Sequence, residues 1–381
     1  METKTFTQKC VLVCPLNWGL GHATRCIPII RILLAQGHRV LIGANGRSRN
    51  LLEIEFPDLT YVSLPDYNIR YPESGAMSSR IMIQLPRLLK TVFTERAILK
   101  GLIKKYDIDF IISDNRFGLY SKKIPSIYIT HQISIIAPKK LKWAEPLIQM
   151  LHKLVMKNFH QVWIPDYQKA PTLSGSLSHS DISPDSRVYV GPLSRFCNNP
   201  RIPKDVVAKE FIIDVKLPDN IDILVIISGP EPQRTIFEKI LFEQLKTRKE
   251  NVLILRGTPE ENAGFKLSES VFVTNHLPTE QLEPIFKKAG VIIARSGYST
   301  IMDLAATGKK AILVPTPGQT EQEYLAHRLM ANGIFYSDSQ NRINLDKALK
   351  EAYVFKGINT IEADSESLEE VIANVVKMEL S

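Results

Sequence analysis

The sequence has no apolar run long enough to cross a membrane. A membrane-spanning helix needs about 20 consecutive apolar residues, whereas the longest run here, residues 221–227, is interrupted by Asp222 and ends at Ser228-Gly229-Pro230. That run predicts a strand followed by a turn. The first ten residues lack the apolar core of a signal peptide. We therefore expect a cytoplasmic protein.

The chain is also poor in cysteine, which disfavours two further classes of protein. Its four cysteines show neither zinc-site spacing nor a C-x-x-C pair, and four thiols in 381 residues do not predict a disulfide framework. They are Cys10, Cys14, Cys26 and Cys197. Hydrophobic residues make up 44% of the chain and charged residues 23%, as in ordinary globular proteins. The length predicts two or three domains.

Positive charge is concentrated in one segment. The chain has a net charge of +8, but residues 80–157 hold 15 Lys and Arg against 5 Asp and Glu, a local net of +10. Within this segment, residues 81–93 and 139–157 mix Lys and Arg with large apolar side chains. Such stretches can lie on an anionic membrane surface; the alternative is helices with a buried face and a solvated basic face. No nucleic-acid-binding signature accompanies them, so we do not expect nucleic acid as a partner.

Short apolar runs alternate with longer helical stretches, which predicts parallel sheets covered by helices. The pattern restarts after the Pro- and Asn-rich residues 190–203. We therefore predict two doubly wound, Rossmann-like α/β domains with a ligand cleft between them. We assign residues 1–195 to the first domain, 196–365 to the second, and 366–381 to a helix that crosses back to the first.

The alternation places each predicted element as follows. Strands are expected at residues 9–14, 39–44, 60–64, 110–113, 126–130, 161–164, 187–190, 223–227, 251–255, 271–274, 291–294 and 311–314. Helices are expected at residues 23–36, 48–55, 79–105 with a break at Pro86, 145–158, 232–245, 279–289, 299–307, 321–332, 345–353 and 368–378.

The segment from residue 291 to 324 is the most informative part of the chain. Its apolar run ends at Arg295-Ser296-Gly297, where free backbone N–H groups and the positive end of a helix could hold a diphosphate. Asp303, inside that helix, is placed to accept hydrogen bonds from ribose hydroxyls. Further polar side chains that could contact the diphosphate or the sugar are Ser299, Thr300, Gln319, Glu321, Gln322 and Glu323. The pattern indicates a nucleotide-sugar site.

A second loop follows the first strand and ends in G-L-G-H, residues 19–22. Gly19 and Gly21 permit a tight turn. His22 lies at the start of the next helix, whose positive end disfavours the imidazolium. A neutral His22 could deprotonate an acceptor hydroxyl; the alternative is a histidine that only caps or packs. The loop lacks the third glycine of a dinucleotide fingerprint and the lysine of a Walker loop.

Other candidates follow predicted strands and should face the same cleft. In the first domain these are Asp114, Asn115 and His131, as acceptor-site residues or as residues that hydrogen-bond their own loops. In the second domain, Ser228-Gly229 forms another possible phosphate cradle. Residues that could contact the donor beside it are Arg195 at the domain junction, Arg234 and Leu277.

These segments together resemble glycosyltransferase family 28, which includes the bacterial undecaprenyl-linked N-acetylglucosaminyltransferase of peptidoglycan synthesis. The similarity lies mainly in R-S-G-Y-S-T-I-M-D-L-A-A-T-G-K-K-A-I-L-V-P with E-Q-E-Y. Weaker matches are G-L-G-H, V-G-P-L-S-R and I-S-G-P-E-P-Q-R. The resemblance implies the GT-B architecture, with a UDP-sugar bound by the second domain and the acceptor by the first.

The resemblance also implies roles by position. It places Asp303 at the ribose, Ser296, Gly297 and Thr300 at the phosphates, Gln322 and Glu323 near the sugar, Arg195 at the hinge and His22 in the N-terminal loop. The family's Gly-Gly-Thr-Gly-Gly-His loop is N-W-G-L-G-H here, so Asn17 and Trp18 predict a reshaped acceptor pocket.

We therefore expect an inverting hexosyltransferase that moves N-acetylglucosamine or another sugar from UDP to a lipid-linked or cell-envelope acceptor. It would need no cofactor and would lie in the cytoplasm, peripherally on the inner face of the membrane. No D-x-D motif occurs in a plausible position, which predicts metal independence because transferases of the other common fold use that motif to hold a metal. The alternatives are a nucleotide-sugar hydrolase and a non-catalytic nucleotide-sugar-binding protein.

Overall fold

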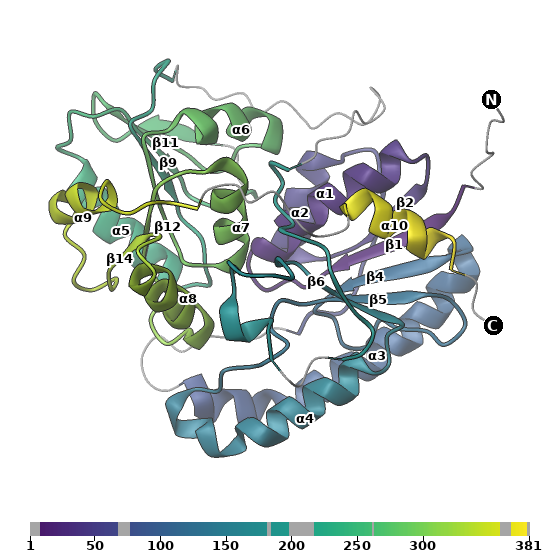
Figure 1. The fold of residues 1–381 in the computed structure, drawn as a ribbon. Coiled ribbons are helices and arrows are strands. Elements are labelled where there is room, and N and C mark those ends of the chain that lie inside the picture. The colour runs from purple at the N-terminus through teal and green to yellow at the C-terminus, as the bar shows by residue number, and fades with distance from the viewer. Residues whose placement is uncertain are drawn as a thin grey trace.

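The protein consists of two α/β halves, each built on one sheet of seven strands (Figure 1). The computed structural model describes residues 8–67, 77–180, 184–197, 217–260, 263–358 and 367–378. All strand pairs in these ranges are parallel except that between β10 and β11. The predicted class, two doubly wound parallel sheets, is confirmed.

The first sheet has the strand order β3-β2-β1-β4-β5-β6-β7. Its strands are β1 Cys10–Pro15, β2 Arg39–Gly43, β3 Thr60–Val62, β4 Phe110–Asp114, β5 Ser126–Ile129, β6 Gln161–Ile164 and β7 Arg187–Tyr189. Its helices are α1 Gly21–Ala35, α2 Gly46–Glu55, α3 Met77–Tyr106 and α4 Glu145–Met156, with 3-10 turns η1 Lys139–Ala144 and η2 Gly175–Leu177. Alternate residues of the fully buried β1 serve opposite layers: Val11 and Val13 belong to the core containing α1, and Leu12 to the core containing Leu99 of α3.

The second sheet has the order β10-β11-β9-β8-β12-β13-β14. Its strands are β8 Ile223–Ile226, β9 Val252–Leu255, β10 Gly264–Lys266, β11 Val271–Thr274, β12 Val291–Ala294, β13 Ala311–Leu313 and β14 Tyr336–Ser337. The helices that follow are α5 Gln233–Leu245, α6 Thr279–Lys288, α7 Tyr298–Thr307, α8 Thr320–Ala331, α9 Leu345–Ala352 and α10 Leu368–Val376.

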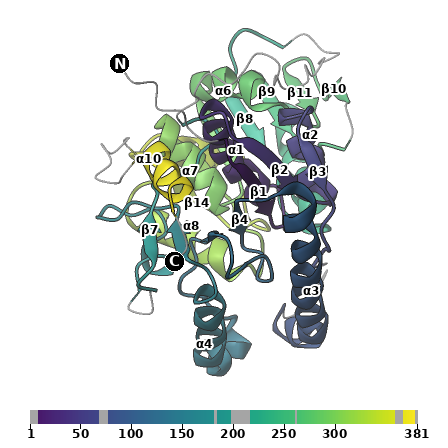
Figure 2. The same ribbon diagram turned by 90° about the vertical axis from the view of Figure 1, so that its right-hand side faces the viewer.

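The two halves share one apolar core. Ile27 of α1, Ile301 of α7 and Ile372 of α10 all belong to the same buried cluster. Helix α10 lies against the first half (Figures 1 and 2), where the Gln36 side chain donates a hydrogen bond to the Glu369 carbonyl at 3.3 Å. Burial of apolar surface therefore holds α1, α7 and α10 together across the junction.

Some elements differ from the prediction. The expected break at Pro86 is wrong, because α3 continues through that residue. Proline removes one backbone hydrogen bond from a helix, but a helix in a protein is stabilised mainly by packing of its apolar face, which later turns of α3 supply through Leu99. The short strands β10 and β14 and the turn η1 were not predicted, since two or three residues give no clear periodicity.

Candidate functional site

The turns that begin α1 and α7 meet at the junction of the halves. Gly21, the first residue of α1, lies so close to Ser299 of α7 that a Cβ atom at position 21 would overlap the Ser299 hydroxyl oxygen. Gly19, just before α1, has a φ of +78°, which glycine adopts without strain. The two glycines of the G-L-G-H loop thus serve a left-handed turn and a close approach.

His22 lies in the first turn of α1 and contacts Asp114 at the end of β4. Its Nδ1 is 3.0 Å from Asp114 Oδ1. Burial lowers the pKa of His22, so the ring is neutral at pH 7. Burial acts to raise the pKa of Asp114, but Arg25 and His22 outweigh it and hold that pKa at about 2. With its proton on Nδ1, the neutral ring donates to this carboxylate and keeps Nε2 free to accept a proton; with its proton on Nε2, Nδ1 instead accepts from an Arg25 Nη that lies 3.0 Å away.

Arg25 is the central cation of this cluster, and it was not predicted. Its Nε donates to Asp114 Oδ2 at 2.7 Å, an Nη donates to Asp114 Oδ1, and the other Nη lies 3.1 Å from His131 Nδ1. In the sequence, G-H-x-x-R places Arg25 three residues after His22, on the same face of a helix. That spacing is the sequence feature from which the contact between Arg25 and the His22 site could have been predicted.

Glu321, at the start of α8, brings the second half into the same cluster. Its carboxylate lies 2.7 Å from His131 Nε2 and also accepts a hydrogen bond from the Gln132 amide. The His131 ring stacks on Tyr298 of α7, with centroids 4.1 Å apart and planes at 10°. The predicted acceptor residue His131 and the predicted donor residue Glu321 are therefore in direct contact.

The other acceptor candidates lie on the loops around this cluster. Asn115 has a φ of +54° and accepts a hydrogen bond from the Tyr128 hydroxyl at 3.0 Å. The Asn17 amide donates to Asp66 at 2.7 Å and so connects two loops of the first half. Trp18 is 37% exposed beside them. Asn115 and Asn17 thus hydrogen-bond residues of the first half.

On the donor side, the predicted loop residues stabilise their own turn. The Ser296 hydroxyl donates to the Gln322 carbonyl at 2.8 Å, and the Gln322 side-chain oxygen accepts from the Thr316 N–H at 2.8 Å. Glu323 accepts from the Gly318 N–H at 2.9 Å. These bonds join the β12–α7 turn to the β13–α8 loop. Three further donor candidates lie beside these bonds: Gly297 precedes α7, Thr300 is half-buried in its first turn and Gln319 precedes α8.

Asp303 contacts Ser194 and Arg195 at the junction of the two halves. Its carboxylate accepts from the Ser194 hydroxyl at 2.6 Å and lies 3.5 Å from Arg195 Nε. Burial raises the pKa of Asp303, although Arg195 and Ser194 oppose the rise. The structure therefore brings the predicted residues Asp303 and Arg195 together, with Asp303 only 6% exposed.

Three arginines lie near the strand ends of the second half. Arg234 donates to Glu231 at 2.5 Å and to Glu238 at 2.8 Å, and Arg256 donates to Glu238 at 2.9 Å. Arg295 is fully buried, and no carboxylate pairs with it among the described residues.

The Arg295 guanidinium instead donates to three backbone carbonyls on two segments, the loop after β13 and the start of α5. The acceptors are the carbonyls of Val314 and Pro315 at 3.3 Å and of Gln233 at 2.9 Å. Burial lowers its pKa to about 9, so it stays charged at pH 7. Nearby, Gly229, which follows Ser228, has a φ of +108°, and Leu277 is fully buried in the core.

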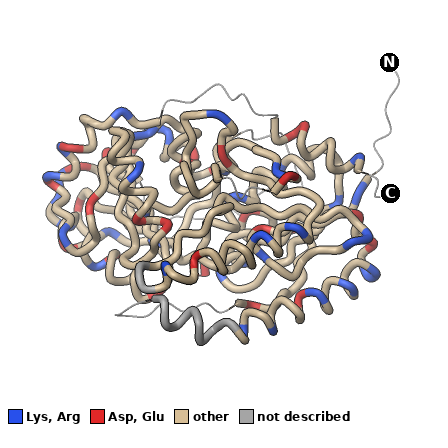
Figure 3. The backbone as a smooth tube through the Cα atoms, turned by 60° about the horizontal axis from the view of Figure 1, so that its bottom comes forward, with Lys and Arg blue, Asp and Glu red and all other residues tan. Residues whose placement is uncertain are grey.

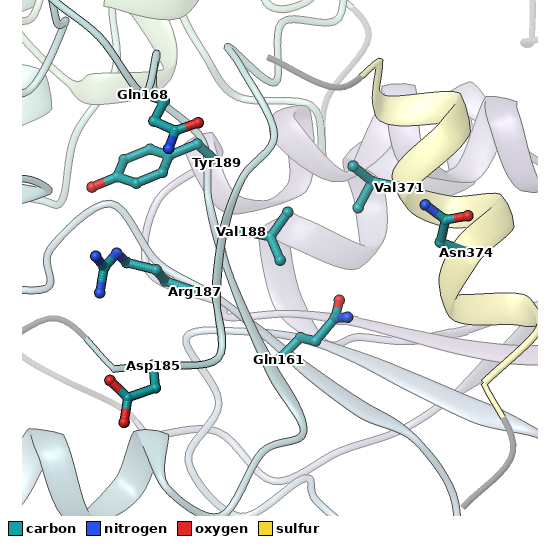
Figure 4. A pocket seen from close by; sticks show the side chains of 8 residues that line it. All are labelled: Gln161, Gln168, Asp185, Arg187, Val188, Tyr189, Val371 and Asn374. Atoms are coloured by element: carbon teal, nitrogen blue, oxygen red, sulfur yellow. The ribbon is translucent and has the colours of Figure 1, made fainter.

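An open groove of about 660 Å³ lies elsewhere, along β6, β7 and α10 (Figure 4). Its lining residues are Gln161, Gln168, Asp185, Arg187, Val188, Tyr189, Val371 and Asn374. None of them belongs to the cluster around His22, so the groove is separate from the candidate site. Among the residues that the structure describes, no group of three His, Cys, Asp or Glu is arranged to hold a metal ion.

Large apolar side chains are exposed on one end of the first half. They lie on α3, on η1 and on α4; helices α3 and α4 lie at the bottom of the molecule in Figure 1 and project there as two separate helices in Figure 2. We call them the apolar end: Leu89, Phe93, Trp143, Leu147, Met150, Leu151 and Leu154, between 47% and 73% exposed. Exposed lysines and an arginine alternate with them along α3 and α4 (Figure 3), among them Arg87, Lys90 and Lys153. No helix in the described parts of the chain is long and apolar enough to span a bilayer.

Residues 223–380, which carry most of this donor side, match the glycosyltransferase family 28 C-terminal domain. The second half of the chain therefore carries a glycosyltransferase family 28 C-terminal domain. An uncharacterized glycosyltransferase of Methanosarcina mazei is 26% identical over 327 residues, covering 80% of each chain. A shorter stretch of 67 residues, 16% of this chain and 18% of the relative, is 36% identical to the UDP-N-acetylglucosamine–N-acetylmuramyl-(pentapeptide) pyrophosphoryl-undecaprenol N-acetylglucosamine transferase of a Methylobacterium.

Solved glycosyltransferase structures share the fold of the whole chain. Acinetobacter baumannii MurG has a TM-score of 0.54 at 14% identity, covering 98% of this chain and 100% of that one. SnogD of Streptomyces nogalater has a TM-score of 0.59 at 12% identity, covering 97% and 99%. SsfS6 of a Streptomyces, complexed with thymidine diphosphate, has a TM-score of 0.55 at 15% identity, covering 97% and 100%. The expected GT-B architecture is confirmed.

Proposed function

We propose that this glycosyltransferase moves a hexose from UDP to a lipid-linked acceptor with inversion at the anomeric carbon, and that it needs no metal or other cofactor. The observation that carries the proposal is the His22–Asp114 pair at 3.0 Å, held on a turn of the first half against α7 and α8 of the second. A base oriented by a carboxylate at the junction of the halves suits deprotonation of an acceptor hydroxyl.

In the proposed step, His22 Nε2 takes the proton of the acceptor hydroxyl as its oxygen attacks the anomeric carbon. The bond from that carbon to the diphosphate oxygen breaks, and UDP leaves with the electron pair. A single displacement inverts the anomeric configuration. Asp114 stabilises the resulting imidazolium, while N–H groups at Ser296-Gly297 and the positive end of α7 stabilise the leaving diphosphate.

Two findings support a nucleotide-sugar donor. The donor half matches the family 28 domain, and the similarly folded SsfS6 was solved with thymidine diphosphate. The choice of UDP rests on the family resemblance, and metal independence rests on the lack of a D-x-D motif in a plausible position. Transfer that continues undiminished in EDTA would agree with metal independence.

The apolar end supports a membrane-bound acceptor. Exposed apolar side chains beside lysines bind the interface of anionic bilayers. We expect the protein to sediment with phosphatidylglycerol vesicles and less with phosphatidylcholine vesicles. Trp143→Glu with Leu147→Glu should abolish sedimentation. The control is Val354→Glu, at a residue 79% exposed in the second half, and it should sediment like the wild type. Equal loss in the control would refute this surface.

The function is tested with radiolabelled UDP-hexoses, the full chain and anionic vesicles made from a bacterial lipid extract. We expect one UDP-hexose to label the lipid fraction and His22→Ala to slow labelling roughly 10² to 10⁴-fold. Release of free sugar without lipid would instead indicate a hydrolase. Protection by UDP against thermal unfolding without any turnover would indicate a binding protein. Full turnover by a folded His22→Ala variant would refute the assignment of the base.

A further inference from the structure

We propose that Arg25 is a positioning residue that couples the His22–Asp114 pair to the closure of the two halves through His131 and Glu321. This inference rests on the proposed function, because it assumes that His22 is the base. It assigns a task to a residue that neither touches the donor loop directly nor has a proton to give.

The buried guanidinium of Arg25 contacts both Asp114 and His131. The Arg25 side chain is only 3% exposed. It donates to both oxygens of Asp114, with Nε at 2.7 Å from Oδ2. A two-pronged contact of this kind fixes the carboxylate in orientation as well as in charge. Asp114 therefore presents Oδ1 to His22 in one geometry.

The same guanidinium determines which nitrogen of His131 carries the proton. Arginine has no acceptor, so at 3.1 Å from an Arg25 Nη the His131 Nδ1 must accept. His22 Nδ1 differs, because it lies 3.0 Å from the other Arg25 Nη but also 3.0 Å from Asp114 Oδ1, to which it can donate. The His131 proton is then on Nε2, which donates to Glu321 at 2.7 Å. Stacking on Tyr298 holds the ring in this plane. Arg25 thus prepares His131 to bind a carboxylate that belongs to the other half.

The charges of this arrangement change the pKa of His22. The groups that face it are Asp114 at the end of β4, Arg25 on its own helix, His131 after β5 and, across the junction, Glu321. Burial is the largest cause of the low pKa of His22; Asp114 raises that pKa, and Arg25 and His131 lower it. Removing the charge of Arg25 should therefore raise the pKa of His22.

The test compares Arg25→Lys, Arg25→Met and Glu321→Gln with the wild-type full chain. Arg31→Lys is the matched control, because Arg31 is as buried on the same helix but pairs with Glu55. Long-range ¹H–¹⁵N spectra of ¹⁵N-histidine protein report each tautomer and each titration. The pH at which kcat/KM for the labelled UDP-hexose falls on the acid side of its profile, the acid limb, reports the pKa of the base.

In the wild type we expect the Nε2–H tautomer of His131. In Arg25→Met we expect that tautomer to be lost, the His22 titration and the acid limb to move to higher pH, and kcat to fall roughly 10²-fold, with KM changing less. In Arg25→Lys we expect the acid limb to return close to its wild-type pH, whereas kcat should stay below its wild-type value. Lysine keeps the positive charge but cannot donate two parallel hydrogen bonds to Asp114 as the guanidinium does. Glu321→Gln, which keeps a hydrogen-bonding oxygen, should lower kcat without moving the tautomer of His131.

Unchanged tautomers and an unchanged acid limb in Arg25→Met would overturn the proposal, as would equal changes in Arg31→Lys. If Arg25→Met does not fold, Arg25→Lys carries the same test through its separate effects on the acid limb and kcat. The spectra also separate this inference from the proposed function. Tautomer and titration changes in a protein without transferase activity would uphold the role of Arg25 and refute the reaction.

Discussion

Glu55 offers the sharpest test of how the halves are held together. This last residue of α2 is 1% exposed, and its Oε1 accepts from both the backbone N–H and the hydroxyl of Thr279, each at 2.7 Å. Thr279 begins α6 in the other half, where the preceding Pro278 makes no side-chain cap. Glu55 therefore caps a helix across the junction, at the end where a negative charge is favourable.

The expected loss of stability follows from these contacts. Glu55→Ala removes two hydrogen bonds to a charged group, each contributing about 1.5–3 kcal/mol, and leaves the Arg31 side chain without the carboxylate 3.6 Å away. Glu280 lies 3.9 Å from Arg31 but is 55% exposed, so it compensates only in part. We expect a loss of about 3–5 kcal/mol in the free energy of unfolding. Glu55→Gln keeps the accepting oxygen and should lose about 1–2 kcal/mol.

The assay is calorimetric unfolding of the full chain at pH 7. For halves of this size, 1 kcal/mol corresponds to about 2–4 °C in Tm, so Glu55→Ala should lower Tm by roughly 10 °C. The matched control is Glu53→Ala on the same helix, since the Glu53 side chain is 37% exposed and pairs with Arg49 at the surface. Such pairs contribute about 0–1 kcal/mol. A Glu55→Ala variant no less stable than Glu53→Ala would refute the reasoning.

Three further outcomes are expected. Gly21→Ala should slow transfer, because its Cβ would meet the Ser299 hydroxyl; Gly21→Ala with Ser299→Ala should transfer faster than Gly21→Ala alone in the labelling assay. Arg295→Met should raise the Kd for UDP on the order of 10-fold in titration calorimetry, because it removes a buried positive charge beneath the phosphate turns. Burial lowers the pKa of His152 from 6.5 to about 4; the unfolded chain therefore binds the proton more tightly, and the wild type should lose on the order of 3 kcal/mol as the pH falls from 6.5 to 4. In denaturant titrations His152→Phe should lack that loss.

The sequence was most informative where local pattern decides the structure. The apolar run before Arg295 forms β12, and the Ser296-Gly297 turn leads into α7 as expected. His22 lies in the first turn of α1, as the G-L-G-H loop indicated. Parallel strands bring their carboxyl ends to one edge of a sheet, so the grouping of His22 with Asp114 followed from topology alone.

Side-chain partners between distant segments could not be predicted. Arg25 donates hydrogen bonds to Asp114, which is 89 residues away in the sequence, and Glu55 accepts from Thr279, which is 224 residues away. Periodicity indicates only that a residue faces inward, whereas the choice between a ligand and a protein partner depends on the packing of both halves. Asp303 shows the difference: its helix was predicted, but not that Ser194 and Arg195 would hold its carboxylate.

Among the carboxylates that connect the halves, Glu55, Asp303 and Glu321 differ in exposure, and their order bears on how a donor enters. The side chain of Glu55 is fully buried against α6, that of Asp303 is 9% exposed at Arg195, and that of Glu321 is 29% exposed at His131. Breaking a contact that is open to water costs the least free energy, because water replaces the lost hydrogen bonds. A buried charge that is left unpaired costs several kcal/mol. Of these three contacts, that of Glu321 is therefore the one that opens at least cost. It is also the contact that lies between the base and the donor loop, where the substrates of the proposed reaction must meet.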